Sequence, residues 1–266
     1  MNNEQLTNSD KWQLPVFETY EFAQKKTKYC IAVPVINEGE RFKNQLSRMK
    51  RFSQLADILI FDGGSTDGST DHAFLKKNGV RTLLVKKGPG RQGTQLRMGF
   101  AYALRQGYTG IVTLDGNGKD SVSSIPQFIN KLEEGYDFVQ GSRFVAGGKA
   151  IRTPLARLIG IRLLHAPLIS VAAGYWYTDT TNGFRAYSRN YLLHPGVQPF
   201  RALFNTYDLL FYLSVRAPQL ALKVTEIPVT RSYPPGKIPT KITGFHHFDV
   251  IITVLNILFH QYHPAQ

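Results

Sequence analysis

Acidic and amide side chains follow directly after a short apolar run near the middle of the chain. Residues 111–114 are rich in β-branched side chains and lead into Asp115 and Asn117, with glycines at the next positions. This pattern predicts a buried strand that delivers a carboxylate to its carboxyl end, where open α/β sheets bind their ligands. Two oxygen-bearing side chains two residues apart can also ligate one divalent cation. An ordinary Asp-Gly turn is the structural alternative.

A second acidic residue ends another predicted strand. The apolar residues 58–61 lead into Asp62 and a glycine-rich turn that includes Gly64. Such a turn can present several backbone N–H groups, and its Asp, Ser and Thr residues suit a helix N-cap. A basic, flexible loop from Lys86 to Arg97 follows the next strand. We expect these groups at one edge of the sheet, where they suit a phosphorylated ligand held partly through metal and partly through Lys or Arg.

The elements that position these residues alternate between strand and helix through the first half of the chain. The predicted strands cover residues 29–35, 57–61, 80–85 and a segment that begins at 111. Helices are predicted from about 37 to 52 and from 94 to 106. This alternation indicates an α/β fold with a parallel sheet flanked by helices and joined by right-handed crossovers. Residues 1–28 are polar and mixed, and we expect a loose arm with a short helix over 16–25.

The second half of the chain carries further charged candidates. A predicted strand over 137–144 ends near Arg143, and a later polar turn carries Asp179 and Arg185. The arginines are available to an anionic ligand, and salt bridges between loops are the structural alternative for both. A late strand over 226–229 is expected at an edge of the sheet, because its proline cannot donate to a ladder. An apolar helix is predicted over 154–173.

Composition limits the classes of protein that need to be considered. The chain has 266 residues, 42% apolar content and a formal net charge of +13, which indicate a globular protein with an anionic partner. No nucleic-acid-binding signature accompanies the charge, so we expect a phosphorylated small molecule or anionic lipid and no nucleic acid. A single cysteine indicates a reducing compartment. The absence of an apolar N-terminal region and of an unbroken apolar run of about 18 residues predicts a cytoplasmic chain with no spanning helix.

Six segments, taken in order, resemble the family 2 glycosyltransferases, in particular the branch that looks like dolichyl-phosphate mannosyltransferase. They are VPVINE at 33–38, DGGSTDG at 62–68, LDGN at 114–117, GSRF at 141–144, NGFRAYSR at 182–189 and TEIPV at 225–229. The resemblance covers roughly residues 29–240 and implies a GT-A fold, with a nucleotide-binding α/β half and an acceptor half in one domain. The arm 1–28 would precede this domain, and a C-terminal apolar helix would occupy 241–266.

The resemblance also assigns roles to individual residues. Pro34 and Glu38 would border the nucleoside, and Asp62, with Gly64 in its turn, would bind the base or ribose. Arg97 in the basic loop would contact the donor. For Glu38, a carboxylate placed favourably at a helix N-terminus is the structural alternative.

The resemblance further implies that Asp115 is the first acid of the Asp-X-Asp element, which holds Mg²⁺ or Mn²⁺ on the diphosphate. Asn117 stands where the family has its second acid, and Lys119 lies two positions further on. An amide attracts a hard cation less than a carboxylate does, and the ammonium group adds repulsion. Lys119 could instead supply the positive charge that a metal gives the leaving diphosphate. Arg143 and Arg185 would face the phosphate or acceptor side.

The implied reaction is an inverting transfer from a nucleoside-diphosphate sugar to a lipid-phosphate or glycan acceptor, in cell-surface polysaccharide or glycolipid synthesis. A hydroxyl acceptor needs a base, for which Asp120 and Asp179 are candidates, whereas a lipid phosphate is already anionic and needs none. Three alternatives remain open at this point: a catalytically inactive nucleotide-sugar binding protein, a nucleotidyltransferase, and a peripheral membrane scaffold.

Residues 245–260 form a predicted helix with an unusually wide apolar face. Asp249, Thr253, Asn256 and His260 make one narrow polar stripe, and almost everything between them is apolar. This face can be buried against the protein's own core beside the 154–173 helix, against a second subunit in a homodimer, or in an anionic membrane surface at the cytoplasmic face.

Overall fold

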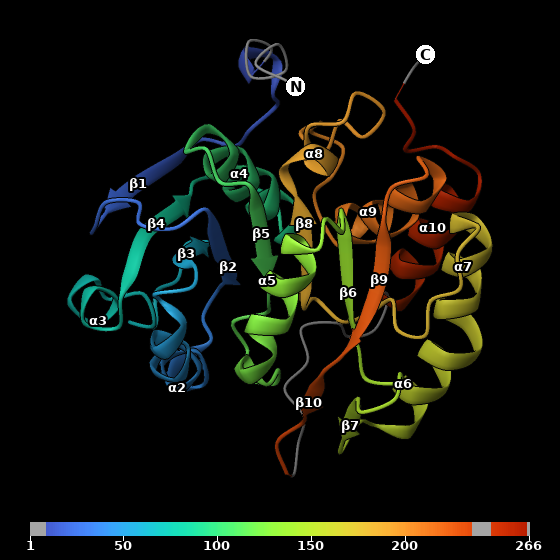
Figure 1. Ribbon diagram of the computed structural model, residues 1–266, viewed down its shortest axis with the longest axis horizontal. Helices are drawn as coiled ribbons and strands as arrows, with labels where there is room; N and C mark the ends of the chain where they lie inside the picture. Colours follow the sequence, from blue (N-terminus) through green and yellow to red (C-terminus); the bar gives the residue numbers. More distant parts are fainter. Residues whose placement is uncertain (1–8, 236–245, 265–266) are drawn as a thin grey trace.

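A twisted sheet of eight strands runs through the molecule, and helices cover both of its faces (Figure 1). The computed structural model describes residues 9–235 and 246–264. The strands from β4 to β5 in the sheet order are parallel, and the pairs β1–β4, β5–β8 and β8–β6 are antiparallel. Their order is β1 (Phe17–Glu21), β4 (Val80–Lys86), β3 (Asp57–Asp62), β2 (Tyr29–Val35), β5 (Gly110–Thr113), β8 (Arg185–Ser188), β6 (Phe138–Ser142) and β9 (Val224–Pro228).

Two hydrophobic cores lie on opposite sides of this sheet, because successive residues of a strand point to opposite faces. Ile31 and Ile60 face the core that includes side chains of α2, α3 and α5, whereas Ala32 and Phe61 face the core that includes those of α4, α7, α9 and α10. The helices are α2 (Gly39–Met49), α3 (His72–Lys77), α4 (Gln92–Arg105), α5 (Ile125–Glu133), α6 (Leu155–Ile159), α7 (Ala166–Ala173), α8 (Arg189–Leu192), α9 (Asp208–Gln219) and α10 (His246–Leu258). The α/β fold with a mostly parallel central sheet is confirmed.

Short elements complete the chain. Single turns of 3-10 helix lie at Ser9–Lys11, Lys50–Phe52 and Val122–Ser124. A second, two-stranded parallel sheet joins β7 (Lys149–Ile151) to β10 (Thr230–Ser232). The late strand β9 is the last strand in the order of the large sheet, which confirms the edge position expected from Pro228.

The N-terminal segment differs from the prediction. The short helix expected over residues 16–25 is wrong, because Phe17–Glu21 forms strand β1 and pairs antiparallel with β4. Phe17 and Tyr20 are partly buried and pack against the two cores, so this part of the arm belongs to the sheet. Aromatic and β-branched residues favour such an edge position once a partner strand is available. The boundary expected at 240 lies outside the described residues.

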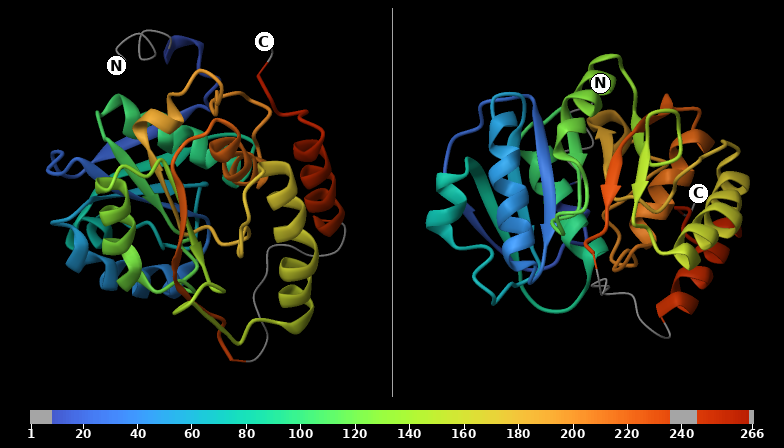
Figure 2. Two further views of the ribbon diagram at one scale, coloured as in Figure 1. Left: turned by 45° about the vertical axis from the view of Figure 1, so that its right-hand side comes forward. Right: turned by 90° about the horizontal axis from the view of Figure 1, so that it is seen from below.

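The predicted apolar helix over 154–173 consists of three parts. A π-helical segment at Gly160–His165 connects α6 to α7. By length and composition alone the whole stretch Leu155–Ala173 could cross a membrane, although arginines interrupt it and about a third of it is buried. The C-terminal helix α10 lies beside α7 and contacts α9 as well, so one side of α10 is buried in the protein's own core (Figures 1 and 2).

Candidate active site

Asp62 and Asp115 lie at the same edge of the sheet, as the sequence predicts. Asp62 is the last residue of β3, and Asp115 follows β5 by two residues. Both strands run parallel to β2, which separates them. Gln45 of α2 holds the turn that carries Asp115, since its amide nitrogen donates to the Asp115 carbonyl at 2.9 Å and its oxygen accepts from the Gly118 N–H at 2.7 Å. The site is therefore built at the carboxyl ends of the parallel strands.

Donors from three separate parts of the chain surround the Asp115 carboxylate. Gln92 at the start of α4 donates to Oδ1 at 3.2 Å, and Asn117 donates to Oδ2 at 3.3 Å. Arg231 donates to Oδ2 at 3.1 Å. Gly183 packs directly against this carboxylate, because a Cβ at that position would lie 2.5 Å from Oδ1. The Asp115 side chain nevertheless keeps 22% of its surface exposed, so a ligand can reach it.

Arg231 is a site residue that the sequence analysis missed. It lies on β10, and its guanidinium bridges Asp115 and Asp120. Burial raises the pKa of Asp120, and Arg231 acts against this rise. Burial would lower the pKa of Arg231, but Asp120 and Asp115 raise it. The signal that could have found this residue is its place two positions after the TEIPV segment.

Arg143 and Asp179 form a second buried ion pair. Arg143 Nε lies 2.6 Å from Asp179 Oδ2, and its Nη2 lies 2.8 Å from Oδ1. Glu226 holds the backbone of the same loop by accepting from the Asp179 N–H at 3.1 Å. Burial acts to raise the pKa of Asp179, but the hydrogen bonds and charge of Arg143 outweigh it and the pKa is lowered. These contacts hold the loop that carries Asp179 in place.

Arg185 is also held by the protein itself. Its guanidinium donates to the carbonyls of Asn182 at 2.9 Å and Thr180 at 2.8 Å, and to that of Leu210. Only 1% of the residue is exposed. The structure thus gives Arg185 the position of a clamp between the 180–182 loop and α9.

Further cations gather around Asp115. Lys119 Nζ lies 5.0 Å from the centre of the Tyr233 ring, and Arg157 donates to the Tyr233 hydroxyl at 2.9 Å. Burial lowers the pKa of Lys119, and Arg231 lowers it further. Burial raises the pKa of Tyr207, Asp115 raises it again, and Arg157, Arg91 and Arg231 lower it, so all four charges act on the Tyr207 hydroxyl. Arg91 belongs to the basic loop that the sequence analysis proposed for a phosphorylated ligand, whereas Arg157 was not among the proposed site residues.

The residues proposed to contact the nucleoside lie at the carboxyl ends of β2 and β3 and in the loops that follow these strands. Asp62 is 2% exposed and accepts hydrogen bonds from its own turn, including the N–H of Gly64 at 3.1 Å. Pro34 is buried within β2, and Glu38 forms an ion pair with Arg41 at 2.9 Å. The contacts of Asp62 and Glu38 are thus made within their own loops, and their role toward a nucleoside stays a prediction.

Arg97 donates its hydrogen bonds to oxygens of the protein itself. Its Nε donates to the Phe204 carbonyl at 2.9 Å and its Nη2 to Asn205 Oδ1 at 3.2 Å, and its Nη1 donates to the Gln13 carbonyl. The residue is 4% exposed, and burial lowers its pKa. Arg97 thus joins the 204–205 loop to the N-terminal segment, and it also lines the larger cavity described below. Its assignment to the donor stays a prediction.

The donors around Asp115 do not fit a divalent ion. Both of its carboxylate oxygens accept hydrogen bonds, one of them from a guanidinium, and Asn117 Oδ1 accepts from the Lys119 N–H at 3.2 Å. Among residues 9–235 and 246–264, no group of three or more His, Cys, Asp or Glu side chains is placed to hold a metal. Hard cations prefer several anionic oxygens, so the predicted metal pair of Asp115 and Asn117 gains no support from this arrangement.

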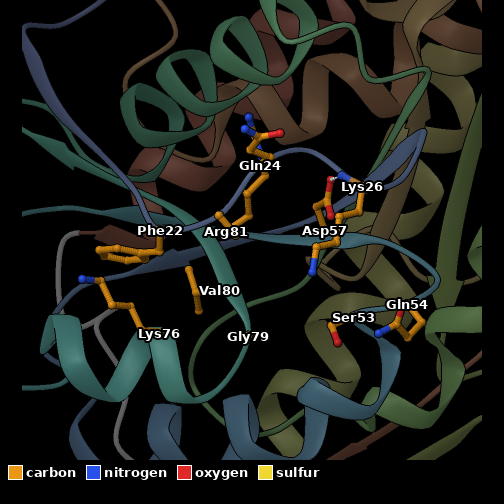
Figure 3. Close-up of a pocket in the computed structure, with 11 residues that line it drawn as sticks. Phe22, Gln24, Lys26, Ser53, Gln54, Asp57, Lys76, Gly79, Val80 and Arg81 are labelled. Carbon is orange, nitrogen blue, oxygen red and sulfur yellow. Dashed lines mark hydrogen bonds between the residues drawn. The ribbon is translucent and has the colours of Figure 1, made fainter.

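Two of the cavities lined by described residues lie at opposite ends of the strands. The cavity in Figure 3, of about 280 Å³, is at the amino ends of β3 and β4, and its Asp57 accepts from the Lys26 N–H at 3.0 Å and the Tyr108 hydroxyl at 2.7 Å. A larger cavity of about 870 Å³ lies between the β4–α4 loop, including Arg91, and Thr206. Ligands of open α/β sheets bind at the carboxyl ends of the strands, and the larger cavity lies next to the carboxyl end of β4.

Solved structures with the same arrangement of elements define the class of fold. Glucosyl-3-phosphoglycerate synthase from Mycobacterium tuberculosis, in complex with Mn²⁺, UDP-glucose and phosphoglyceric acid, matches with a TM-score of 0.63 at 18% identity, over 87% of this chain and 79% of that one. The complex of the same enzyme with Mn²⁺, UDP and glucosyl-3-phosphoglycerate matches with a TM-score of 0.62 at 16% identity, over 87% and 80%. The fold is the GT-A fold of glycosyltransferases.

The family follows from the sequence comparison. The profile described as Glycosyl transferase family 2 matches residues 30–194, more than half of the chain, so the chain belongs to this family and is a glycosyltransferase. Undecaprenyl-phosphate mannosyltransferase of Micrococcus luteus is 27% identical over 74% of this chain and 81% of its own length. Polyprenol monophosphomannose synthase of Mycolicibacterium smegmatis is 26% identical over 75% and 76%. Glycosyltransferase AglJ of Haloferax volcanii is 27% identical over 76% of this chain, which spans 62% of the length of AglJ.

Proposed function

We propose that this glycosyltransferase moves a hexosyl group, with inversion, from a nucleoside-diphosphate sugar to a lipid phosphate. The choice of acceptor rests on one observation: the two carboxylates proposed as bases are buried in ion pairs. Asp120 is paired with Arg231 and Asp179 with Arg143, and their exposed fractions are 1% and 0%. Neither can reach the proton of an acceptor hydroxyl, and a phosphate acceptor needs no base.

The relatives support this acceptor and a role in cell-surface glycan synthesis. Undecaprenyl phosphate appears in the names of the Micrococcus luteus mannosyltransferase and of the 4-deoxy-4-formamido-L-arabinose transferase of Serratia proteamaculans, which is 27% identical over 76% of this chain. The UDP-glucose complex of the Mycobacterium tuberculosis enzyme supports a nucleoside-diphosphate sugar as donor.

The proposed reaction breaks the bond between the anomeric carbon and the diphosphate oxygen. A phosphate oxygen of the acceptor attacks that carbon from the opposite side, and the nucleoside diphosphate leaves with the electron pair. This chain's part is to place the two reactants and to stabilise the charge that grows on the diphosphate. Arg91 and Arg157, whose charges act together with that of Asp115 on the Tyr207 hydroxyl, suit the anionic acceptor. The Mycobacterium tuberculosis enzyme was solved with Mn²⁺, but the donor set around Asp115 in this chain does not fit a divalent ion.

We also propose that the chain binds an anionic bilayer at the cytoplasmic face through one apolar face. α6–α7 and α10 lie side by side at one end of the molecule (Figures 1 and 2). The exposed apolar side chains of these helices and of the residue after α10 include six that we call the apolar face and that are 40% to 75% exposed: Leu155, Ile159, Leu163, Ile252, Leu255 and Phe259. The exposed Arg152 and Arg162 lie beside them and complement anionic lipid headgroups. An amphipathic surface of this composition suits an interfacial position, which would bring the site close to a lipid acceptor.

The acceptor is tested with a matched pair of lipids. The purified chain is incubated with a panel of nucleoside-diphosphate sugars and either a polyprenyl phosphate or the corresponding polyprenol, and products are identified by mass spectrometry. We expect a polyprenyl-phosphate sugar from the phosphate and no product from the alcohol. The Asp115→Asn variant is expected to keep its fold and lose transfer. Transfer to the alcohol, or full activity of Asp115→Asn, would overturn the proposal.

A further inference from the structure

We propose that Arg231 takes the place of a divalent ion at Asp115. The bridging guanidinium occupies the position beside this acid where a metal would bind, and it supplies positive charge that acts on the donor diphosphate. The role toward the diphosphate rests on the proposed function, whereas the exclusion of a metal from Asp115 does not.

The geometry places the guanidinium between two carboxylates. One of its nitrogens lies 3.1 Å from Asp115 Oδ2, and another donates to Asp120 Oδ2. A divalent ion would need these same oxygens. Arg231 is 7% exposed, so it is part of the protein interior and not a side chain that reaches in from solvent.

The backbone on both sides of Arg231 is held as well. The Ser232 N–H donates to the Lys119 carbonyl at 2.8 Å, and the Ser121 N–H donates to the Thr230 carbonyl at 2.9 Å. β10 is thus joined to the segment that follows Asp115 and Asn117. Such a preorganised cation needs no reorganisation when charge develops on a leaving group.

The local charges favour the same conclusion. Asn117 brings no negative charge, and Lys119 lies close enough to Arg231 for their charges to interact. Two carboxylates are therefore already balanced by two cations of the protein. A divalent ion beside Asp115 would be repelled by both cations, with little water between them to screen the repulsion.

A substitution that removes the guanidinium should reverse this situation. In Arg231→Gln, Asp115 and Asp120 flank a vacated space with two carboxylates, which is the ligand chemistry that Mn²⁺ and Mg²⁺ prefer. We therefore expect Arg231→Gln to gain metal binding. The double variant Arg231→Gln/Asp120→Asn has one acid fewer and should not gain it. Arg143→Gln, which opens the other buried Arg–Asp pair and leaves Asp115 and Arg231 unchanged, serves as a matched control.

The experiment titrates the full-length chain with MnCl₂ alone and measures free Mn²⁺ by electron paramagnetic resonance. We expect at least ~10-fold tighter binding by Arg231→Gln than by the wild type, and no gain in the double variant or in Arg143→Gln. Equal affinities of the wild type and Arg231→Gln would overturn the proposal.

A second arm needs no substitution of Arg231, so it remains decisive if that variant fails to fold. Mn²⁺ binding by the wild type that disappears in Asp115→Asn would also overturn the proposal. No donor or acceptor is present in either arm. A protein that excludes Mn²⁺ but transfers no sugar to a polyprenyl phosphate would therefore contradict the proposed function and leave the exclusion of metal standing.

Discussion

Replacing two exposed leucines of α6 and the following π-helical turn should release the chain from anionic membranes. Leu155 and Leu163 are 70% and 75% exposed in the structure. Full burial of a leucine side chain contributes ~2 kcal/mol, so each of these partly exposed side chains would contribute ~1.5 kcal/mol on entering the interface. Since 1.4 kcal/mol corresponds to a factor of ten, each Leu→Ser variant should weaken membrane partitioning about tenfold and the double variant about a hundredfold.

Co-sedimentation with vesicles of phosphatidylglycerol and phosphatidylcholine measures this effect. Leu55→Ser is the matched control, because Leu55 is also exposed, at 46%, but lies just before β3, away from α6–α7 and α10. Binding should fall with salt, since part of it is electrostatic. Unchanged partitioning of the double variant would refute the membrane reasoning. A loss of dimer on size-exclusion chromatography with unchanged vesicle binding would assign the apolar face to a second subunit instead.

Three further perturbations follow from contacts at the site. Gly183→Ala places a Cβ 2.5 Å from Asp115 Oδ1 and must displace that carboxylate. Transfer to a polyprenyl phosphate should therefore fall by ~10²-fold, with little change in the urea midpoint of unfolding. A native rate of transfer would contradict this. Arg143→Lys keeps the charge but loses the two-pronged contact with Asp179, and should lower the free energy of unfolding by ~1–3 kcal/mol, measured in urea. The exposed Arg152→Lys is its control, and equal midpoints would argue against a structural role. Burial, aided by Arg185, lowers the pKa of His165 to about 4. The neutral imidazole therefore contributes fully to the free energy of unfolding above pH 6.5, and this contribution, roughly 3 kcal/mol, is lost as the pH falls toward 4. His165→Gln should abolish that part of the pH dependence, and parallel losses in both proteins would refute it.

The sequence alone determined the layout of the nucleotide-binding half. Apolar runs ending in polar, glycine-rich turns predict strands at residues 29–35 and 57–61, and the structure has β2 and β3 there. The reason is local: a parallel strand covered on both faces must be apolar along its length, and its ligand-binding turn follows immediately. Asp62 and Asp115 were therefore placed at one edge without knowledge of any contact. The order of six short segments was also enough to indicate the family.

The first strand shows where local pattern stops being sufficient. Residues 17–21 combine aromatic and β-branched side chains with two glutamates, yet a helix was expected over residues 16–25. β1 exists because β4 offers it an unpaired edge, and β4 lies more than sixty positions away in the chain. Pairing between distant strands depends on the tertiary arrangement, which no short window contains.

Only the tertiary structure decides which partner each charged residue contacts. The sequence identifies Arg143, Arg185 and Asp179 as chemically capable, but it does not say which partner each one meets. Arg143 meets Asp179 across 36 positions, and Arg231 meets Asp115 across 116. A buried charge must find its counter-charge wherever the fold places one, because leaving it unpaired in the interior costs several kcal/mol. That requirement turned two predicted bases into members of ion pairs, and it brought an arginine of the last described strand to the acid at the centre of the site.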